Sequence, residues 1–271
     1  MEMELPLVSC LCPTYGRPEL LQEAICCFLQ QDYPNKELVV LNDHPNAITL
    51  DRDYPGVYVY NCSQRFQSLG QKRNDLVRRA RGDFLMNWDD DDLYLPWRIS
   101  EMMKHLYPAA DKWFCKPTQA WRSTNNGNYR LNQSHFHGQA AMRRILFDEL
   151  GGYAEMNVGE DLDLEARVPR ERRIVYRAQP SELCYVYREG NGIAHISEFR
   201  MDQPGRPTSW ERMADRYRDR AGGLLIPGFG RNHWQDVLEA ARTAPGVDPV
   251  QLFLLTRRLE PYLGTASSPT L

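Results

Sequence analysis

The sequence predicts an α/β fold of the nucleotide-binding kind, built around a mostly parallel sheet. Short apolar runs alternate with helix-period patterns over residues 5–88. The links between these segments are short, which favours parallel strands joined by right-handed crossovers. Acidic residues follow the ends of two of the apolar runs, and ligands of such folds gather at the carboxyl ends of the strands.

The first three strands and the first helix follow from local patterns. Residues 5–12 are a short apolar run fit for a buried strand, and the turn-forming residues 13–18 end it. Residues 37–41 and 57–60 predict the second and third strands. Between the first two strands, one apolar helical stripe combines Leu20, Leu21, Ala24, Ile25, Phe28 and Leu29.

The next elements lead to the most informative part of the chain. A helix is expected at 71–81, ended by Gly82, and a fourth strand at 83–88. This strand runs directly into four aspartates at 89–92. Further strands are expected near 113–116 and 174–176.

The C-terminal part reads as helical. Ser209 is a candidate N-cap for a helix that carries Trp210, Met213 and Tyr217. Helices near 233–242 and 249–258 follow.

Composition excludes several classes of protein. The 271 residues are 42% apolar and 25% charged, which is unlike disordered, collagen-like or disulfide-scaffold chains. No stretch reaches the 18 apolar residues of a membrane span, and the N-terminus lacks a signal-like pattern, so we expect a cytoplasmic protein without stable membrane insertion. The seven cysteines form no zinc-like or redox-like pair and are expected as reduced, mostly buried thiols. A net charge of -3 provides no global attraction for nucleic acid.

The four aspartates at 89–92 predict a cation site. Neighbouring carboxylates about 4 Å apart repel by roughly 1 kcal/mol even in water. A solvated acidic turn is the alternative, but apolar residues lead directly into the run and residues 93–97 lead directly out of it. Oxygen ligands suit Mn²⁺ or Mg²⁺, which share their coordination shell with substrate phosphates.

Five segments in order resemble the glycosyltransferase family 2 enzymes, which have the GT-A fold. Residues 8–15 resemble the opening strand and its Pro-Thr-Tyr-Asn turn, and residues 37–43 resemble the second strand with its Asp-Asp end. Residues 72–74 resemble the Ala-Arg-Asn helix start. Residues 80–96 resemble the Ala-x-Gly-Asp strand, the DxD metal motif and a trailing proline, and residues 159–164 resemble the Glu-Asp-x-Asp-Leu segment.

The resemblance implies how the donor is bound. Tyr15 and Asp43 match positions that hold the nucleotide base, and Asp91 matches the aspartate that binds the metal. Mn²⁺ or Mg²⁺ on the diphosphate would neutralise the charge that develops on the leaving nucleotide. Further contacts to the nucleotide sugar are expected from Pro13, Arg17, Arg65, Lys72, Asp89, Asp90 and Glu160.

The resemblance also implies a catalytic base. Asp161 matches the residue that deprotonates the acceptor hydroxyl, and a base on the face opposite the leaving group gives inversion. Capping of a helix N-terminus is the alternative for Asp161. His195 matches a position where some GT-A enzymes have a metal ligand, and a structural histidine is its alternative.

The expected organisation is a GT-A catalytic domain at 1–203 and a C-terminal helical extension at 204–271. Within the first, residues 1–111 would bind the nucleotide sugar and residues 112–203 the acceptor. The expected function is metal-dependent, inverting transfer of one hexose from a UDP-sugar to a hydroxyl of a saccharide, a lipid carrier or a modified nucleic acid. No Gln-x-x-Arg-Trp motif is present, which disfavours a processive synthase.

Two departures and two alternatives stay open. Gly16 stands where the family usually has Asn, and residues 42–45 replace Asp-Asp-Gly-Ser. One alternative is sugar transfer to a modified base in DNA, and a nucleotidyltransferase is another, weakened by the lack of a Gly-rich triphosphate loop. The arginines within 167–188 are expected to form either a solvated face or a binding site for an anionic acceptor. For the DNA alternative, phosphate contacts would come from Trp210, Arg212, Arg216, Arg218 and Arg220.

Overall fold

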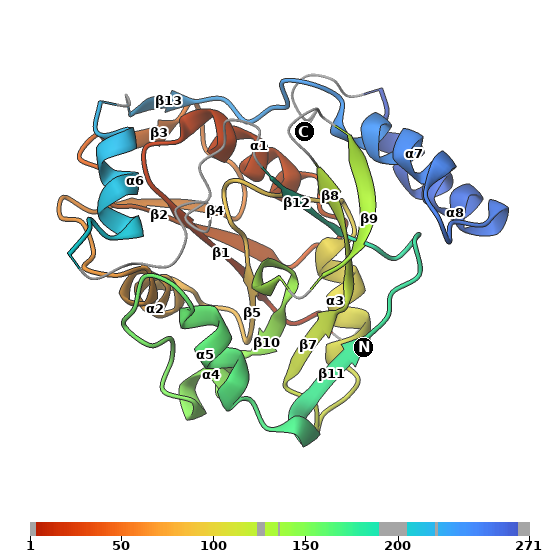
Figure 1. Cartoon of the computed structure of the whole chain (residues 1–271), viewed down its shortest axis with the longest axis horizontal. Helices are drawn as coiled ribbons and strands as arrows, with labels where there is room; N and C mark the ends of the chain where they lie inside the picture. The colour runs from red at the N-terminus through yellow and green to blue at the C-terminus, as the bar shows by residue number, and fades with distance from the viewer. Residues whose placement is uncertain (1–3, 124–127, 135, 190–204, 220–221, 265–271) are drawn as a thin grey trace.

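The computed structural model describes residues 4–123, 128–134, 136–189, 205–219 and 222–264 (Figure 1). The strands are β1 (Val8–Thr14), β2 (Lys36–Asn42), β3 (Ile48–Leu50), β4 (Val57–Asn61), β5 (Phe84–Asn87), β6 (Leu93–Tyr94), β7 (Phe114–Pro117), β8 (Gln119–Ser123), β9 (Tyr129–Gln133), β10 (Ala141–Arg143), β11 (Arg173–Tyr176), β12 (Tyr185–Arg188) and β13 (Gly223–Leu225). The α-helices are α1 (Pro18–Leu29), α2 (Leu69–Arg79), α3 (Arg98–Leu106), α4 (Arg144–Glu149), α5 (Glu160–Arg167), α6 (Ser209–Tyr217), α7 (His233–Thr243) and α8 (Pro249–Leu259).

A seven-stranded sheet runs through the described part of the chain in the order β11-β7-β10-β5-β1-β2-β4. β1 pairs in parallel with β2 and β5, and β2 pairs in parallel with β4. Only β10 in this sheet runs against its neighbours β5 and β7. The predicted α/β fold is therefore confirmed, with the carboxyl ends of β1, β2 and β5 at one edge.

Helices cover both faces of this sheet, which explains why its central strands are almost continuously apolar. Successive side chains of a strand point to opposite faces. Cys10 and Cys12 of β1 therefore belong to the cluster that includes α1 and α3. Leu11, between them, belongs to the cluster that includes α2, α4 and α5.

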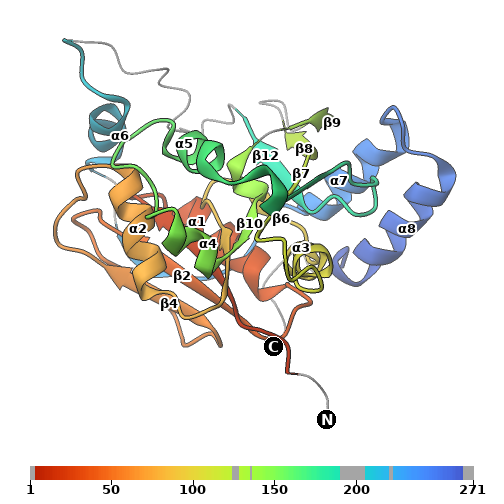
Figure 2. The ribbon, with the colours of Figure 1, turned by 90° about the horizontal axis from the view of Figure 1, so that it is seen from below.

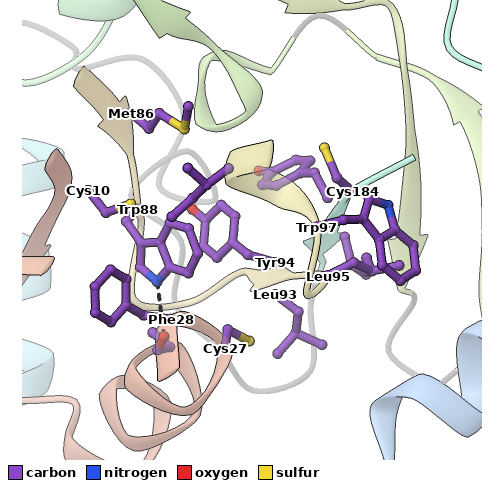
Figure 3. Packing of buried hydrophobic residues seen from close by; sticks show 14 of the residues in the cluster. Cys10, Cys27, Phe28, Met86, Trp88, Leu93, Tyr94, Leu95, Trp97 and Cys184 are labelled. Carbon is purple, nitrogen blue, oxygen red and sulfur yellow. Dashed lines mark hydrogen bonds between the residues drawn. The ribbon is translucent and has the colours of Figure 1, made fainter. Parts of the chain in front are cut away.

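Aromatic packing fixes the end of β5, where the aspartate run begins (Figure 3). Trp88 is fully buried, stacks on Tyr94 with ring centroids 4.0 Å apart, and donates from Nε1 to the Ala24 carbonyl at 2.9 Å. The backbone N–H of Asp89 donates to the Tyr94 hydroxyl at 2.6 Å. The acidic residues thus project from a rigid support rather than from a solvated turn.

The C-terminal part of the chain divides between two sides of the molecule (Figures 1 and 2). α6 lies beside α2, whereas α7 and α8 lie on the opposite side, where α7 packs next to β9 and α8 packs on α7. Between them, β13 pairs in parallel with β3, a two-stranded sheet that the sequence did not predict.

Two predicted details were wrong. α2 ends at Arg79, because Ala80 already has an extended backbone, so Gly82 does not end the helix. The N-cap of α6 is Thr208 rather than Ser209, and Thr208 forms a capping box with Glu211.

The cysteines of the described chain are free and, except for Cys62, buried. None of the helices in the described ranges is long and apolar enough to cross a bilayer.

Candidate active site

A cavity of about 100 Å³ lies where β1 and β5 end and where α2 and α6 begin. Seven residues expected at the donor site line it, namely Pro13, Tyr15, Arg17, Lys72, Asp89, Asp90 and Asp91. The other lining residues, which the sequence did not assign to the donor site, are Thr14, Leu69, Arg73, Trp210 and Met213. The cavity thus brings together aromatic rings, cations and carboxylates.

Arg17 joins the two central aspartates of the run. Its Nη1 donates to Asp91 Oδ2 at 2.8 Å, and its Nε donates to Asp90 Oδ2 at 3.1 Å. Thr14 donates to the same Asp90 oxygen at 2.6 Å. Burial raises the pKa of Asp90 above its ordinary value, with the Arg17 charge opposing this and the Asp91 charge adding to it.

Arg73 joins the aspartate run to the start of α5. It donates to Asp89 Oδ1 at 3.0 Å and to Glu160 Oε1 at 3.2 Å. Burial raises the pKa of Glu160, with Arg73 opposing this and Asp161 adding to it. Asp161 is partly exposed and does not line the cavity, but its negative charge helps to raise the pKa of Arg73.

The oxygen ligands of the aspartate run fit a hard divalent cation. Asp89 and Asp91 face the cavity. Within the described residues no group of three His, Cys, Asp or Glu could hold a metal alone. Mn²⁺ and Mg²⁺ take one or two protein carboxylates and obtain other ligands from phosphates and water. The predicted ligand His195 lies outside the described residues.

Asp43 is at the centre of a buried network instead of lining the cavity. Lys72 forms an ion pair with its Oδ1 and donates to the Thr14 carbonyl at 2.6 Å. The other oxygen, Oδ2, accepts from the N–H of Phe66 at 3.0 Å. Asp43 therefore holds the segment before α2 against the end of β2, and its expected contact with a base stays a prediction.

The two departures from the family pattern meet in space. The imidazole of His44 lies edge-on to Tyr15, with centroids 4.8 Å apart. It also lies over Gly16, where a Cβ would be 2.8 Å from its Cδ2. Gly16 has a φ of +61°, a backbone conformation that suits glycine. A glycine at position 16 thus makes room for the histidine at position 44.

Backbone and amide contacts from α2 position the segment before α5. Asn74 exchanges two hydrogen bonds with the backbone of Tyr153, at 2.9 and 2.8 Å. The N–H of Gly70 donates to the Met156 carbonyl at 3.1 Å, and the N–H of Leu69 donates to Asn157 at 3.1 Å. α2 therefore carries Lys72 and Arg73 and also sets where α5 begins.

A second network ties α7 to the aspartate run. Arg188 donates from Nε to the Asp91 carbonyl at 2.6 Å and forms an ion pair with Glu23 of α1. His233 of α7 lies between Glu23, 3.0 Å from its Nε2, and Tyr129, 2.9 Å from its Nδ1. No local motif in the sequence marked Glu23 or His233.

Several arginines of the 167–188 cluster bind the protein itself. Arg167 donates to Asp163 and to the Gly152 carbonyl at 2.9 and 2.7 Å. Arg173 donates to the Val168 carbonyl at 3.0 Å, and Arg172 stacks on Trp113. These guanidinium groups therefore stabilise the local backbone and do not form an open binding site for an anionic acceptor.

Residues 9–158 match the model of the Glycosyl transferase family 2, which is more than half of the chain. The chain therefore belongs to this family of enzymes, as the motifs predicted. This membership sets the nucleotidyltransferase alternative aside.

Curated relatives match over parts of the chain. The putative colanic acid biosynthesis glycosyl transferase WcaA of Escherichia coli is 30% identical over 107 residues, 37% of this chain and 38% of the relative. The GalNAc(5)-diNAcBac-PP-undecaprenol beta-1,3-glucosyltransferase of Campylobacter jejuni is 31% identical over 107 residues, 37% of this chain and 34% of the relative. The chain thus spans well under half the length of these two relatives.

Solved structures share the fold over nearly the whole chain. TarS of S. aureus in complex with UDP-GlcNAc has a TM-score of 0.56 at 14% identity, covering 97% of this chain and 74% of that one. The mannosyltransferase PcManGT of Pyrobaculum calidifontis, in complex with GDP-Man and Mn²⁺, has a TM-score of 0.51 at 18% identity, covering 98% and 78%. The predicted GT-A fold is confirmed.

Proposed function

We propose that this protein transfers a single sugar from a nucleoside diphosphate sugar to a hydroxyl acceptor, with inversion and with Mn²⁺ or Mg²⁺. The observation that carries the proposal is the cavity, in which Tyr15, three cationic side chains and the aspartate run converge at the carboxyl edge of the sheet. A nucleotide needs a stacking surface and cations for its phosphates, and the metal needs carboxylates.

The charged residues of the site have different proposed roles, according to their chemistry. Arg17, Lys72 and Arg73 supply positive charge to a diphosphate, while Asp89 and Asp91 would hold the metal. When bound, the metal supplies charge neutralisation on the departing diphosphate. Asp161 takes the proton of the acceptor hydroxyl. At the same time the hydroxyl oxygen of the acceptor bonds to the anomeric carbon, and the bond from that carbon to the diphosphate breaks.

Uridine is the base that we propose for the donor. TarS, the better-scoring of the two structures compared above, was solved with UDP-GlcNAc. The acceptor is proposed only as a saccharide or lipid-linked hydroxyl, in line with the undecaprenol-linked substrate in the name of the Campylobacter relative. A DNA acceptor gains no support, because Trp210 is buried in the cavity wall and Arg218 pairs with Asp215.

A thermal-shift panel tests the proposal. UDP, GDP and CDP, with and without Mn²⁺, should stabilise the protein unequally, with the largest shift for UDP plus Mn²⁺. Equal shifts for the three nucleotides would remove the preference for uridine. No shift with any nucleotide or nucleotide sugar would contradict the whole proposal.

A further inference from the structure

We propose that α6 forms the outer wall of the donor site and that Trp210 stacks on the nucleobase, opposite Tyr15. This inference rests on the proposed function, because it takes the ligand to be a nucleoside diphosphate. It adds a base-binding residue from a part of the chain that lies beyond the family match at 9–158.

The first argument is that one planar group already occupies the space beside two aromatic rings of the cavity, Tyr15 and Trp210, which we call the slot. The guanidinium carbon of Arg65 lies 3.7 Å from the centre of the Tyr15 ring and 4.2 Å from the centre of the Trp210 ring. The planar guanidinium group of Arg65 therefore already lies over both rings. A nucleobase is also planar, and base–aromatic stacking tolerates every base.

The second argument is that Arg65 is poorly satisfied in this slot. Its Nη2 donates to the Trp210 carbonyl at 3.0 Å. Its Nε and Nη1 are buried without a hydrogen-bond partner among the described residues. Buried donors that lack acceptors cost free energy. A base that takes the place of the guanidinium group would let Arg65 donate to phosphate or water instead, which removes this cost.

The third argument is the chemistry beside the slot. Lys72 Nζ lies 5.9 Å from the centre of the Trp210 ring, and Arg73 lines the same cavity. Arg73 Nη1 is also buried without a partner in the described part of the chain. A base between the rings would thus place its diphosphate next to two cations, one of which has an unused donor.

The fourth argument is that α6 is held in place at both of its ends. At its start, Trp210 Nε1 donates to the Phe66 carbonyl at 3.0 Å. At its end, the Tyr217 carbonyl lies 2.8 Å from His44 Nε2, so the histidine that fills the space over Gly16 also anchors the helix. Between these points, Met213 packs with Tyr15 and Leu69.

Calorimetry on the full-length chain with Mn²⁺ tests the proposal, using UDP and inorganic pyrophosphate as two probes. Pyrophosphate carries the charge of the donor but has no base. Trp210→Ala should raise the Kd for UDP by roughly 5- to 150-fold, the range expected for the loss of one stacked aromatic ring. It should leave the Kd for pyrophosphate within about twofold. Trp210→Phe, which keeps a ring in the slot and serves if the alanine variant folds poorly, should retain most of the UDP affinity.

The matched control is Trp113→Ala. Trp113 also stacks on an arginine, with Arg172 Cζ 3.9 Å from its ring centre, but it does not line the cavity. This variant should bind UDP as the wild type does.

Each outcome decides between the two proposals. Equal UDP affinity of wild type and Trp210→Ala would overturn the role of Trp210 and leave the proposed function standing. Equal weakening of UDP and pyrophosphate would overturn it too, because α6 would then only support the fold. A wild type that binds no nucleotide would overturn the proposed function together with this inference.

Discussion

Gly70 of α2 offers a sharp test of how the fold positions α5. A Cβ built at residue 70 would lie 1.9 Å from the Ala154 carbonyl oxygen, and real Cβ atoms are essentially never closer than 3.0 Å to such a neighbour. Gly70→Ala must therefore move the segment 153–157 by about 1.1 Å relative to α2, since 3.0 minus 1.9 is 1.1. That segment leads directly into Glu160 and Asp161.

The expected consequence is a loss of turnover with donor binding largely kept. A displacement of about 1 Å in catalytic geometry can cost roughly 100-fold in rate. Overpacking of this kind also destabilises by about 1–3 kcal/mol. The Lys72 ammonium binds the Thr14 carbonyl and Asp43, which both lie outside the displaced segment, so the Kd for UDP should change by less than about threefold.

The assay is release of nucleoside diphosphate from a panel of nucleotide sugars, with calorimetry for UDP binding. Gly228→Ala is the control, because the nearest atom to a Cβ there is the Ile226 carbonyl oxygen at 3.9 Å. A Gly70→Ala enzyme with kcat within about threefold of wild type would refute the argument that α2 sets the position of Asp161.

Three other substitutions test separate parts of the site. Asp161→Asn should lower turnover by roughly 100- to 10,000-fold without changing UDP affinity, and wild-type turnover would exclude Asp161 as the base. Asp91→Asn should raise the Mn²⁺ concentration needed for half-maximal UDP binding in a calorimetric titration, and an unchanged midpoint would exclude it as a ligand. Burial would raise the pKa of Glu23, but the His233 hydrogen bond and the Arg188 charge lower it from 4.5 to about 2. This shift in pKa corresponds to about 3 kcal/mol in the free energy of unfolding at pH 7. A carboxylate with a lowered pKa loses this contribution as pH falls from the unfolded value toward the folded one, so the urea-measured difference between wild type and Glu23→Gln should shrink to less than half between pH 7 and pH 3. A constant difference would contradict the ion-pair assignment.

The order of elements and the acidic edge of the sheet were accessible from sequence because both depend on local patterns. Buried strands leave apolar runs, and four adjacent carboxylates at the end of such a run need a partner. The boundaries of the helices were less accessible. Gly82 is a plausible stop signal, yet α2 ends three residues earlier, where Ala80 takes an extended backbone.

The part that α6 plays in the site could not be predicted from sequence. Thr208, Glu211 and the spacing of Trp210, Met213 and Tyr217 indicate a capped helix with one apolar face. Nothing in that pattern says which surface the face covers, because hydrophobic packing is non-directional. The same limit applies to Arg167 and Arg173, whose carbonyl acceptors come from backbone geometry and leave no sequence signal.

The buried charges of the site pair in a way that constrains how a donor would enter. Arg17 holds Asp90 and Asp91, Lys72 holds Asp43, and each side chain is less than one tenth exposed. Breaking one such pair leaves an uncompensated buried charge, at a cost of about 3–5 kcal/mol. A diphosphate that arrived alone would draw Arg17 away from both aspartates, and a metal that arrived alone on Asp89 and Asp91 would take one of these two partners from Arg17. A diphosphate together with a divalent cation supplies both missing partners at once, so binding of nucleotide and metal should be strongly cooperative at this site.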